Sequence, residues 1–462
     1  MPIRVGVFLF ACALSGCTMM PTYERPAAPV AAEFPGTSGG SSGANASSAG
    51  QPAADILWAD FFKEERLKKL IALALNNSRD LRVAALNVEQ SRAQYRITRA
   101  DFYPDVNVSG GATRQRAGGL TSTQWSANVG VSAYELDLFG RLRSLNQQAL
   151  ETYLATDEAR RGTQISLVAE VATQYFTLRE AQEQLRLARQ TLAAVEESYR
   201  TNRASFDAGE SNELNVRIAE GQVQTAKFNV LAAERQIAQA ENALVLLLAQ
   251  SLPPDLPEEQ PFDDAHLLSD IPAGLPSDLI QRRPDILQSE HTLKAANANI
   301  GAARAAFFPS ITLTGSVGTA SAQLSGLFAS GSDAWTFSPS ISLPIFNAGK
   351  TRAQLTYAEL SERIDVANYE KSIQTAFREV ADALAANRSY LAQIEVETDA
   401  IATQQRRLEL ATLRYRQGED SYLNVLSAQQ DLYNAQQNLL QARFNTLSSQ
   451  ISLYKALGGG WQ

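Results

Sequence analysis

The stretches DAGESNELNV (residues 207–216) and RQGEDSYLNV (residues 416–425) share one pattern, Gly-Glu followed after three residues by Leu-Asn-Val. Gly209 and Gly418 lie about 209 positions apart, which is too long for a solenoid repeat, so the pattern indicates a duplicated half. Each glycine stands between a long segment of helix-forming residues and a heptad repeat. We expect both glycines to adopt a positive φ and to close a helical hairpin, because glycine takes that conformation without steric cost.

Long helices are predicted on both sides of each glycine. Proline interrupts helix interiors; it is absent from residues 105–252 and 345–462 and dense in residues 253–284. A single helix over residues 141–207 would be roughly 100 Å long. After each glycine, apolar residues recur every seven positions, which predicts left-handed supercoiling. The series are Val216, Val223, Val230, Ile237 and Leu244 in the first half, and Leu426, Tyr433, Leu440, Leu447 and Tyr454 in the second.

The first residues have the layout of a secretory signal. Arg4 precedes an apolar run, and LSGC at residues 14–17 resembles a bacterial lipobox, which implies removal of residues 1–16 and acylation of Cys17. Thr18 stands where an inner-membrane retention signal usually has Asp, so sorting to the outer membrane is favoured. A plain signal peptide is the alternative. Residues 17–57 are rich in Pro, Ala, Gly and Ser and predict a tether between a lipid anchor and the folded body.

Four segments alternate apolar and small polar residues with period two, one pair in each half (about 105–136 and 310–344). In the sequence WSANVGVSAY, Trp125 and Val131 are expected on one face, and Ser132 and Tyr134 on the other. A soluble sheet with one wet face fits this alternation, but the lipobox favours transmembrane strands around a wet interior. Four strands cannot close a barrel. Two chains would give a barrel filled by side chains, whereas three would give twelve strands and a lumen.

Composition and motifs argue against several classes of protein. The net charge of -8 comes without a Lys/Arg cluster, so a nucleic-acid partner is not expected. Both cysteines lie in the first 17 residues, and His266 and His291 lie in different segments, so no metal site is expected. No convincing catalytic or nucleotide-binding motif is present. We therefore expect no enzyme activity and no cofactor apart from the covalent lipid on Cys17.

Four motifs resemble those of the TolC/OprM-type outer-membrane efflux channels, in their lipoprotein, NodT-like branch. These motifs are GLPSDLIQRRPDI (274–286), AARAAFFPSITLTGSVG (302–318), SPSISLPIFNAGK (338–350) and ISLYKALGGGW (451–461). The resemblance implies an α+β membrane protein that closes as a trimer, with a 12-stranded β-barrel in the outer membrane of a Gram-negative bacterium and a 12-helix α-barrel in the periplasm. It also implies partnership with a periplasmic adaptor and an inner-membrane pump of the RND type.

The resemblance further implies a domain organisation. It divides the mature chain into a first structural repeat (58–250), a Pro-rich equatorial connection (251–276), a second structural repeat (277–458) and a C-terminal tail (459–462).

The resemblance places a periplasmic gate at the start of the heptad helices. By alignment Leu423 is the apolar constriction, Asn424 and Ser427 occupy positions where relatives often have aspartates, and Gln430 stands where a relative often has arginine. We therefore expect the gate to depend on packing and amide hydrogen bonds more than on ion pairs. Further candidates are Asn215, which answers Asn424, and the carboxylates of Asp420, Glu419 and Glu213. Gly209, Gly418, Glu210 and Glu419 are expected at the hairpin tips, where an adaptor docks.

Two other functions are compatible with these features. An exit duct for type I protein secretion has the same fold, because the pump and not the channel selects the cargo. A lipid-anchored coiled-coil scaffold without a pore would follow if the period-two segments formed a soluble sheet.

Overall fold

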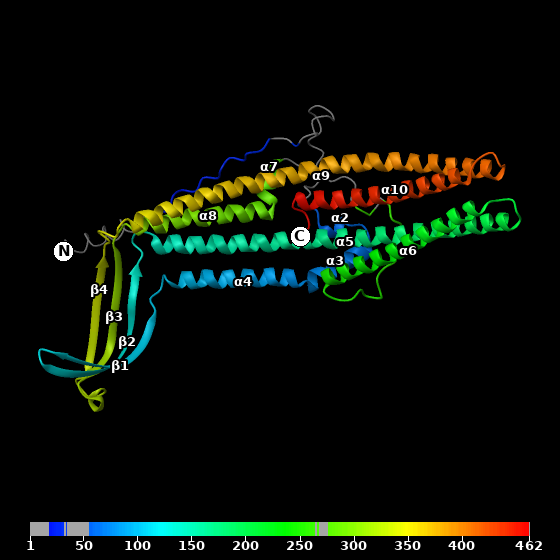
Figure 1. Cartoon of the computed structure of the whole chain (residues 1–462). Coiled ribbons are helices and arrows are strands. Elements are labelled where there is room, and N and C mark those ends of the chain that lie inside the picture. Colours follow the sequence, from blue (N-terminus) through cyan, green and yellow to red (C-terminus); the bar gives the residue numbers. More distant parts are fainter. Residues whose placement is uncertain (1–17, 32–33, 35–54, 264–265, 268–275, 462) are drawn as a thin grey trace. The chain divides into compact units, whose positions relative to one another are not determined.

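The computed structural model describes residues 18–31, 34, 55–263, 266–267 and 276–461, so the predicted signal segment and Cys17 lie outside the described residues. The described residues form two compact units, one from residues 18–28, 86–158 and 287–371 and the other from the described residues of 29–85, 159–286 and 372–461. The helices labelled in Figure 1 are α2 (Trp58–Phe61), α3 (Glu65–Asn77), α4 (Arg79–Ala100), α5 (Arg141–Asp207), α6 (Glu213–Leu248), α7 (Pro276–Arg282), α8 (Pro284–Ala305), α9 (Lys350–Arg416) and α10 (Tyr422–Ala456).

The first unit contains a four-stranded antiparallel sheet with the order β1-β2-β3-β4 (Figure 1). The strands are β1 (Val106–Ala117), β2 (Leu120–Leu136), β3 (Ser310–Ser321) and β4 (Asp333–Ser342). The predicted strand pair of each half is confirmed, and the two hairpins join through β2 and β3. Exposed apolar side chains share one face in cross-strand rows, for example Val108, Val129, Val317 and Trp335. Strands β1 and β4 each have one neighbour and form the two edges of the sheet.

A bulge in β2 corrects one prediction about its faces. Val131 pairs with Gly315 and Tyr134 pairs with Leu313, so two residues of β2 oppose the single Thr314. Ala133 has φ 55°, and its N–H donates to Thr314 Oγ1 at 3.0 Å. An extra residue reverses the alternation of side chains beyond it. Tyr134 therefore lies on the same face as Val131, and its predicted place beside Ser132 is wrong.

Residues 18–28 are not a free tether, which corrects the prediction for that part of residues 17–57. Arg25 donates to Glu290 on α8 from Nη2 at 2.8 Å and from Nε at 3.1 Å, and Glu290 is 2% exposed. Asn297 Nδ2 donates to the carbonyl of Pro21 at 3.0 Å. A Cβ on Gly301 would lie 2.8 Å from Met20 Cα, so the absent side chain permits this close approach. The rest of the predicted tether, residues 35–54, lies outside the described residues.

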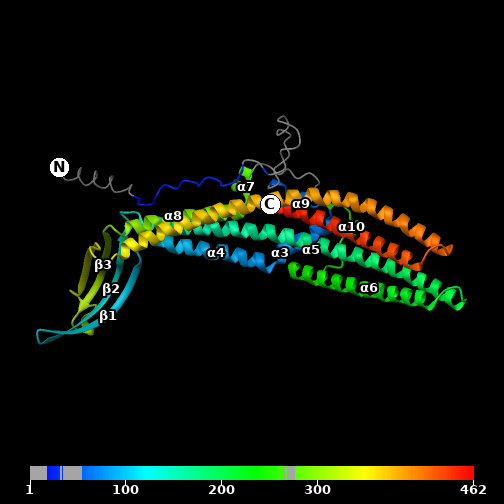
Figure 2. The ribbon, with the colours of Figure 1, turned by 45° about the horizontal axis from the view of Figure 1, so that its top comes forward.

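The second unit holds helical hairpins of great length, as the absence of proline predicted. Helices α5 and α9 have 67 residues each, and α6 and α10 have 36 and 35. Figure 2 shows α6 beside the far part of α5 and α10 beside the far part of α9. The predicted heptad series of α10 is buried throughout, from Leu426 to Tyr454. Within the described residues, no helix has a stretch that is both long and apolar enough to cross a membrane.

The core of the second unit explains the GGGW ending. Tyr454 stacks on Phe61 with ring centroids 4.0 Å apart, and its hydroxyl donates to the carbonyl of Ile56 at 2.6 Å. Gly459 packs so tightly against the Tyr454 ring that any side chain would overlap it. Gly458 and Gly460 have φ of 85° and 104°, which favours glycine at both positions. The glycines therefore return the chain end over the aromatic core.

A buried polar cluster fixes the equatorial segment to the start of α3. Glu64, Tyr175 and His266 are each 1% exposed. The Tyr175 hydroxyl donates to Glu64 Oε1 at 2.5 Å, and His266 Nδ1 lies 3.1 Å from Glu64 Oε2. His266 Nε2 lies 2.7 Å from the Pro261 carbonyl. The short contact of His266 Nε2 with the Pro261 carbonyl requires a proton on Nε2, and Nδ1 lies within ion-pair distance of Glu64 Oε2, so the geometry favours a charged His266 and an ionised Glu64.

The pKa values of this pair follow from two opposing causes. Burial opposes ionisation of Glu64, but hydrogen bonds from His266 and Tyr175 outweigh it and hold the pKa of Glu64 below its usual range. Burial also opposes protonation of His266, but the hydrogen bond and charge of Glu64 outweigh it and raise the pKa of His266. Because the pKa of Glu64 is lowered in the folded state, its ionisation stabilises the fold fully at pH values above the ordinary glutamate pKa. Because the pKa of His266 is raised, its protonation stabilises the fold fully at pH values below the ordinary histidine pKa. The full contribution therefore falls between about pH 4.3 and 6.5.

We predict that His266→Ala destabilises the second unit by about 3–5 kcal/mol, because it leaves the Glu64 carboxylate buried without its cation. Urea unfolding of the second unit, followed by near-UV circular dichroism, measures the loss. The double variant Glu64→Gln/His266→Gln removes both charges and should recover most of it. The difference between wild type and His266→Ala should be largest between about pH 4.3 and 6.5 and shrink on both sides. A difference that is constant from pH 3 to 9 would contradict the charged pair.

Candidate functional site

The turns that contain the repeated Gly-Glu have the same geometry in both halves. Gly209 (φ 78°) and Gly418 (φ 74°) follow α5 and α9, which confirms the predicted helical hairpins. The Gly209 N–H donates to Phe206 O and that of Glu210 to Ser205 O, at 2.9 and 2.8 Å. Gly418 and Glu419 repeat this pattern with the carbonyls of Tyr415 and Arg414. These paired bonds satisfy the last carbonyls of a helix and require the left-handed conformation of glycine.

The shared asparagines have a local structural role in these turns. Asn215 Nδ2 donates to Ser211 Oγ at 3.2 Å, four residues earlier. Asn424 Nδ2 donates in the same way to Asp420 Oδ1. The Asn215 backbone N–H in turn donates to Asn212 Oδ1 at 2.9 Å, which caps α6. Each asparagine therefore holds the first turn of its helix to the loop before it.

Hydrogen bonds between partly buried polar groups join the two hairpins near their tips. The Tyr422 hydroxyl and Ser198 Oγ lie 2.6 Å apart, and the Tyr415 hydroxyl donates to Asn202 Oδ1 at 3.0 Å. Tyr422 is 3% exposed and packs with Ala219, Val425 and Leu426 in a small apolar cluster. The contact therefore fixes the α9–α10 hairpin against α5.

Two leucines at the tips are exposed in the single chain. Leu423 is 64% exposed, and its counterpart Leu214 is 65% exposed. The polar residues predicted beside Leu423 are also on the surface: Ser427 Oγ lies 3.4 Å from Asp431 Oδ2, and Gln430 Nε2 donates to Asn434 Oδ1 at 2.9 Å. These contacts leave Leu423 free to meet another surface.

Ion pairs across the α9–α10 hairpin were not predicted from the sequence. Arg407 on α9 pairs with Asp431 on α10 and also donates to Ser427 Oγ at 3.2 Å. Arg414 lies 3.5 Å from Asp420 and 3.8 Å from Glu419. The expectation that the gate depends on packing and amide hydrogen bonds more than on ion pairs did not include these pairs. The sequence could have predicted the Arg407–Asp431 pair, because residues at similar distances on either side of Gly418 must face one another in a hairpin.

Asp420 is held in its charged form. The Ser421 backbone N–H donates to it at 2.8 Å, and this bond, the Asn424 amide and Arg414 lower the pKa of Asp420. Asp420 and Asn424 line a groove of about 830 Å³ along the hairpin. Its other lining residues are Ala402, Thr403, Arg406, Arg407, Leu410, Ala411 and Arg414. Arg406, Arg407 and Arg414 thus make the walls of the groove cationic, and the carboxylate of Asp420 is fixed at one end of it.

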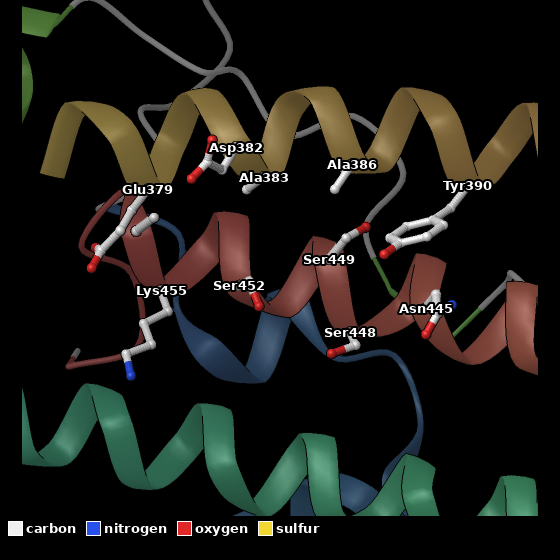
Figure 3. Close-up of a pocket in the computed structure, with 11 residues that line it drawn as sticks. Glu379, Asp382, Ala383, Ala386, Tyr390, Asn445, Ser448, Ser449, Ser452 and Lys455 are labelled. Carbon is white, nitrogen blue, oxygen red and sulfur yellow. The ribbon is translucent and has the colours of Figure 1, made fainter. Parts of the chain in front are cut away.

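A second groove lies between α9 and α10 farther from the tips (Figure 3). It has a volume of about 460 Å³ and hydroxyl-rich walls. Tyr390 on α9 and Ser449 on α10 lie next to one another, and Ser452 and Lys455 lie one turn apart on α10 (Figure 3). Ser449 Oγ already donates to the carbonyl of Thr446 at 2.8 Å. The arrangement provides a polar contact surface rather than an activated nucleophile.

The histidines do not form a metal site. Across the described residues, no group of three or more His, Cys, Asp or Glu side chains is placed to hold a metal ion. His266 belongs to the buried cluster with Glu64, and His291 Nδ1 lies 2.6 Å from Glu151 Oε2. Both have structural partners.

We predict that Tyr422→Phe loosens the contact between the hairpins. A buried neutral hydrogen bond contributes about 1 kcal/mol, so the amides of residues 195–203 and 419–427 should exchange hydrogen about fivefold faster. Tyr390→Phe, on α9 beside the second groove, is the matched control and should leave these amides unchanged. Equal exchange in Tyr422→Phe and wild type would show that the hydroxyl does not hold the tips.

Similar proteins share the whole architecture. The family described as outer membrane efflux protein matches residues 70–250 and 275–459. The toluene efflux pump outer membrane protein TtgC of Pseudomonas putida is 49% identical over 458 residues, covering 97% of this chain and 93% of that protein. The cation efflux system protein CusC of Escherichia coli is 43% identical over 464 residues, covering 100% and 99%.

Solved structures agree with the sequence relatives. The open state of the MtrE outer membrane channel of Neisseria gonorrhoeae has a TM-score of 0.86 and 40% identity, covering 96% of this chain and 99% of that one. A membrane protein from Pseudomonas aeruginosa has a TM-score of 0.88 and 42% identity, covering 96% and 98%. The chain belongs to the outer membrane efflux protein family.

Proposed function

We propose that this protein is the outer-membrane exit duct of a tripartite efflux system, in which it passively conducts small compounds delivered by an inner-membrane pump and a periplasmic adaptor. Family membership supports the efflux role. The main structural observation in favour of a duct is that the sheet has two open edges. Further copies of the chain are needed to pair these edges and close the sheet into a barrel. The pump provides the energy, so the duct itself needs no catalytic group.

Three copies form the duct. Edge strands β1 and β4 leave backbone N–H and C=O groups unpaired, and lipid cannot satisfy them. Pairing β1 of one copy with β4 of the next gives a closed ring, and three copies give twelve strands with a lumen. The exposed apolar face then meets lipid. Small polar residues such as Asn107, Ser109, Asn128 and Ser340 line the interior.

The hairpin tips form the gate. In a trimer, three α9–α10 hairpins and three α5–α6 hairpins meet in a ring, and the exposed Leu423 and Leu214 face neighbouring copies or the pore. An apolar constriction closes by excluding water. The pKa of Asp420 lies below its usual range, so we do not expect this carboxylate to make closure depend on pH between 4 and 7. Glu210 and Glu419, at the hairpin tips, contact the adaptor in this proposal.

The cargo is proposed to be small organic compounds. Relatives at 49% identity include a toluene efflux protein and an antibiotic efflux protein, whereas the cation efflux relative is 43% identical. Cargo metal ions such as copper or silver favour thiolate, thioether and imidazole ligands. Beyond Met20 the sequence contains no methionine or cysteine and only two histidines, so such ligands are scarce along the duct. We further propose an RND-type pump as partner and a lipid on Cys17.

Planar-bilayer recording of the purified protein tests the duct and its gate. Leu423→Ser should raise the conductance severalfold, because a hydroxyl ring admits water where leucine excludes it. Leu246→Ser is the matched control, since Leu246 is 79% exposed on α6 far from the tip turn, and it should behave as wild type. The closed-state conductance of wild type should vary little between pH 4 and 7.

Two results would contradict this account in different ways. A steep change of conductance with pH in that range would assign gating to a carboxylate with an ordinary pKa. No conductance from wild type or Leu423→Ser, in preparations that are folded and oligomeric, would favour the non-conducting scaffold.

A further inference from the structure

Two arginines lie at the far end of the β1–β2 hairpin, on its apolar face. Arg114 pairs with Thr123 and Arg116 with Thr121, in register with the rows of Val106 and Val108. Residues directly opposite in an antiparallel pair share a face, and every second residue along a strand shares it as well. The arginines therefore lie on the side of the sheet where Val106 is 67% and Val108 83% exposed. Their strand neighbours Thr113 and Gln115 lie on the other face.

The height of the apolar band places these arginines just outside it. Tyr134 and Trp125 lie on this face, and their partners on β3, Leu313 and Ser321, are eight positions apart, about 27 Å along the strand at 3.4 Å per residue. A strand tilt of about 40° reduces this to roughly 21 Å, near the apolar band of about 25 Å in outer-membrane barrels. Aromatic residues mark both borders of such a band. Trp125 pairs with Ala112, so Arg114 and Arg116 lie two and four residues beyond the outer border.

This distance matches the headgroup layer. Two and four residues at the same tilt correspond to about 5 and 10 Å of height. Each headgroup layer of a bilayer is roughly 5–7 Å thick. The backbone of Arg114 thus lies within the layer and that of Arg116 a few Å beyond it, a gap that the long arginine side chain can span, on the side that faces lipid.

The hairpin provides no internal partner for these cations. Residues 106–134 contain two arginines and no Asp or Glu. In the part of the chain that the structure describes, neither guanidinium has an ion pair. The one carboxylate at the outer end of this face is Asp333, which pairs with Thr319 on β3, and β2 and β3 separate it from β1 within the chain. In the closed ring β4 of the neighbouring copy lies beside β1, and a register that pairs Ser109 with Ser338 brings its Asp333 opposite Arg114, so one carboxylate faces two arginines. A planar guanidinium binds phosphate through two parallel hydrogen bonds.

We propose that Arg114 and Arg116 bind the phosphate groups of a phosphorylated glycolipid in the outer leaflet. The inference rests on the proposed function, because it needs the strands inserted as a barrel in the outer membrane. Two observations identify this ligand: its phosphates carry the charge opposite to that of the arginines, and the two side chains lie at the height of the headgroup layer. Its role is to fix the height of the barrel and to seal the lipid against β1.

Lipid retention by the purified trimer tests the proposal. The trimer in detergent is titrated with bisphosphorylated lipid A and, separately, with the same lipid after removal of its phosphates, and bound lipid is counted by native mass spectrometry. Arg114→Gln/Arg116→Gln should weaken binding of the phosphorylated lipid by roughly 30-fold, as two interfacial arginines would. Binding of the dephosphorylated lipid should be weak and equal in both proteins.

A face-swapped variant is the matched control. Thr113→Arg/Arg114→Thr/Gln115→Arg/Arg116→Gln keeps the net charge of the strand but moves both cations to the other face. It should lose the phosphorylated lipid as completely as the double variant. Retention in either variant would overturn the proposal, because the charges on the lipid face would then not be the ligands.

Two further measurements distinguish lipid binding from a loss of the channel and from an ion pair with Asp333 of a neighbouring copy. The double variant should keep its conductance in planar bilayers, so loss of the channel would concern the proposed function and not the lipid site. Asp333→Asn should leave binding of the phosphorylated lipid unchanged or strengthen it, because one fewer carboxylate then competes for the arginines. If Asp333→Asn instead loosened the trimer to the same degree as the double arginine variant, the arginines would pair with Asp333 of a neighbouring copy, and the proposal would fail.

Discussion

The unpaired backbone groups along β1 and β4 are the constraint on which the rest of the structure depends. A sheet with one apolar face and two open edges is unstable both in water and in lipid, since each environment leaves one requirement unmet. Closure between copies satisfies both requirements at once. The internal duplication then has a physical use, because each chain supplies two hairpins and only a few chains are needed to make a ring with a lumen.

The long helices satisfy their backbone hydrogen bonds within themselves, unlike the edge strands. Helices of 67 residues satisfy their own backbone, so their stability depends on the heptad seam and on fixed ends. Polar contacts also hold other parts of the chain to these helices: Glu64 and His266 hold the equatorial segment beside Tyr175 in the interior of α5, while Tyr422 and Ser198 join the hairpins near their tips. The hairpin tips combine short surface contacts with exposed leucines. Such regions are less stable than a core, which is compatible with the gate proposed there.

Much of this architecture was predictable, because local rules govern it. Proline-free heptads predicted the long helices, period-two alternation predicted the strands, and glycine predicted the turns at Gly209 and Gly418. The predictions failed where distant parts of the chain meet. The bulge that reverses Tyr134 depends on pairing with β3, and the contact of Arg25 with Glu290 joins residues 265 positions apart. The Arg407–Asp431 pair needed the geometry of the hairpin rather than the comparison of single positions.

Disulfide cross-linking between β1 and β4 tests the central claim, that the edges of the sheet close between three copies. Both natural cysteines lie in the first 17 residues, so a pair can be introduced at Ser109 and, in turn, at Thr336, Ser338 or Ser340. Within one chain β1 and β4 are about 14 Å apart, beyond the reach of a disulfide. One of these pairs should give covalent dimers and trimers and nothing larger. Cross-linked species that stop at dimers, extend past trimers or never form would contradict the closed ring of three.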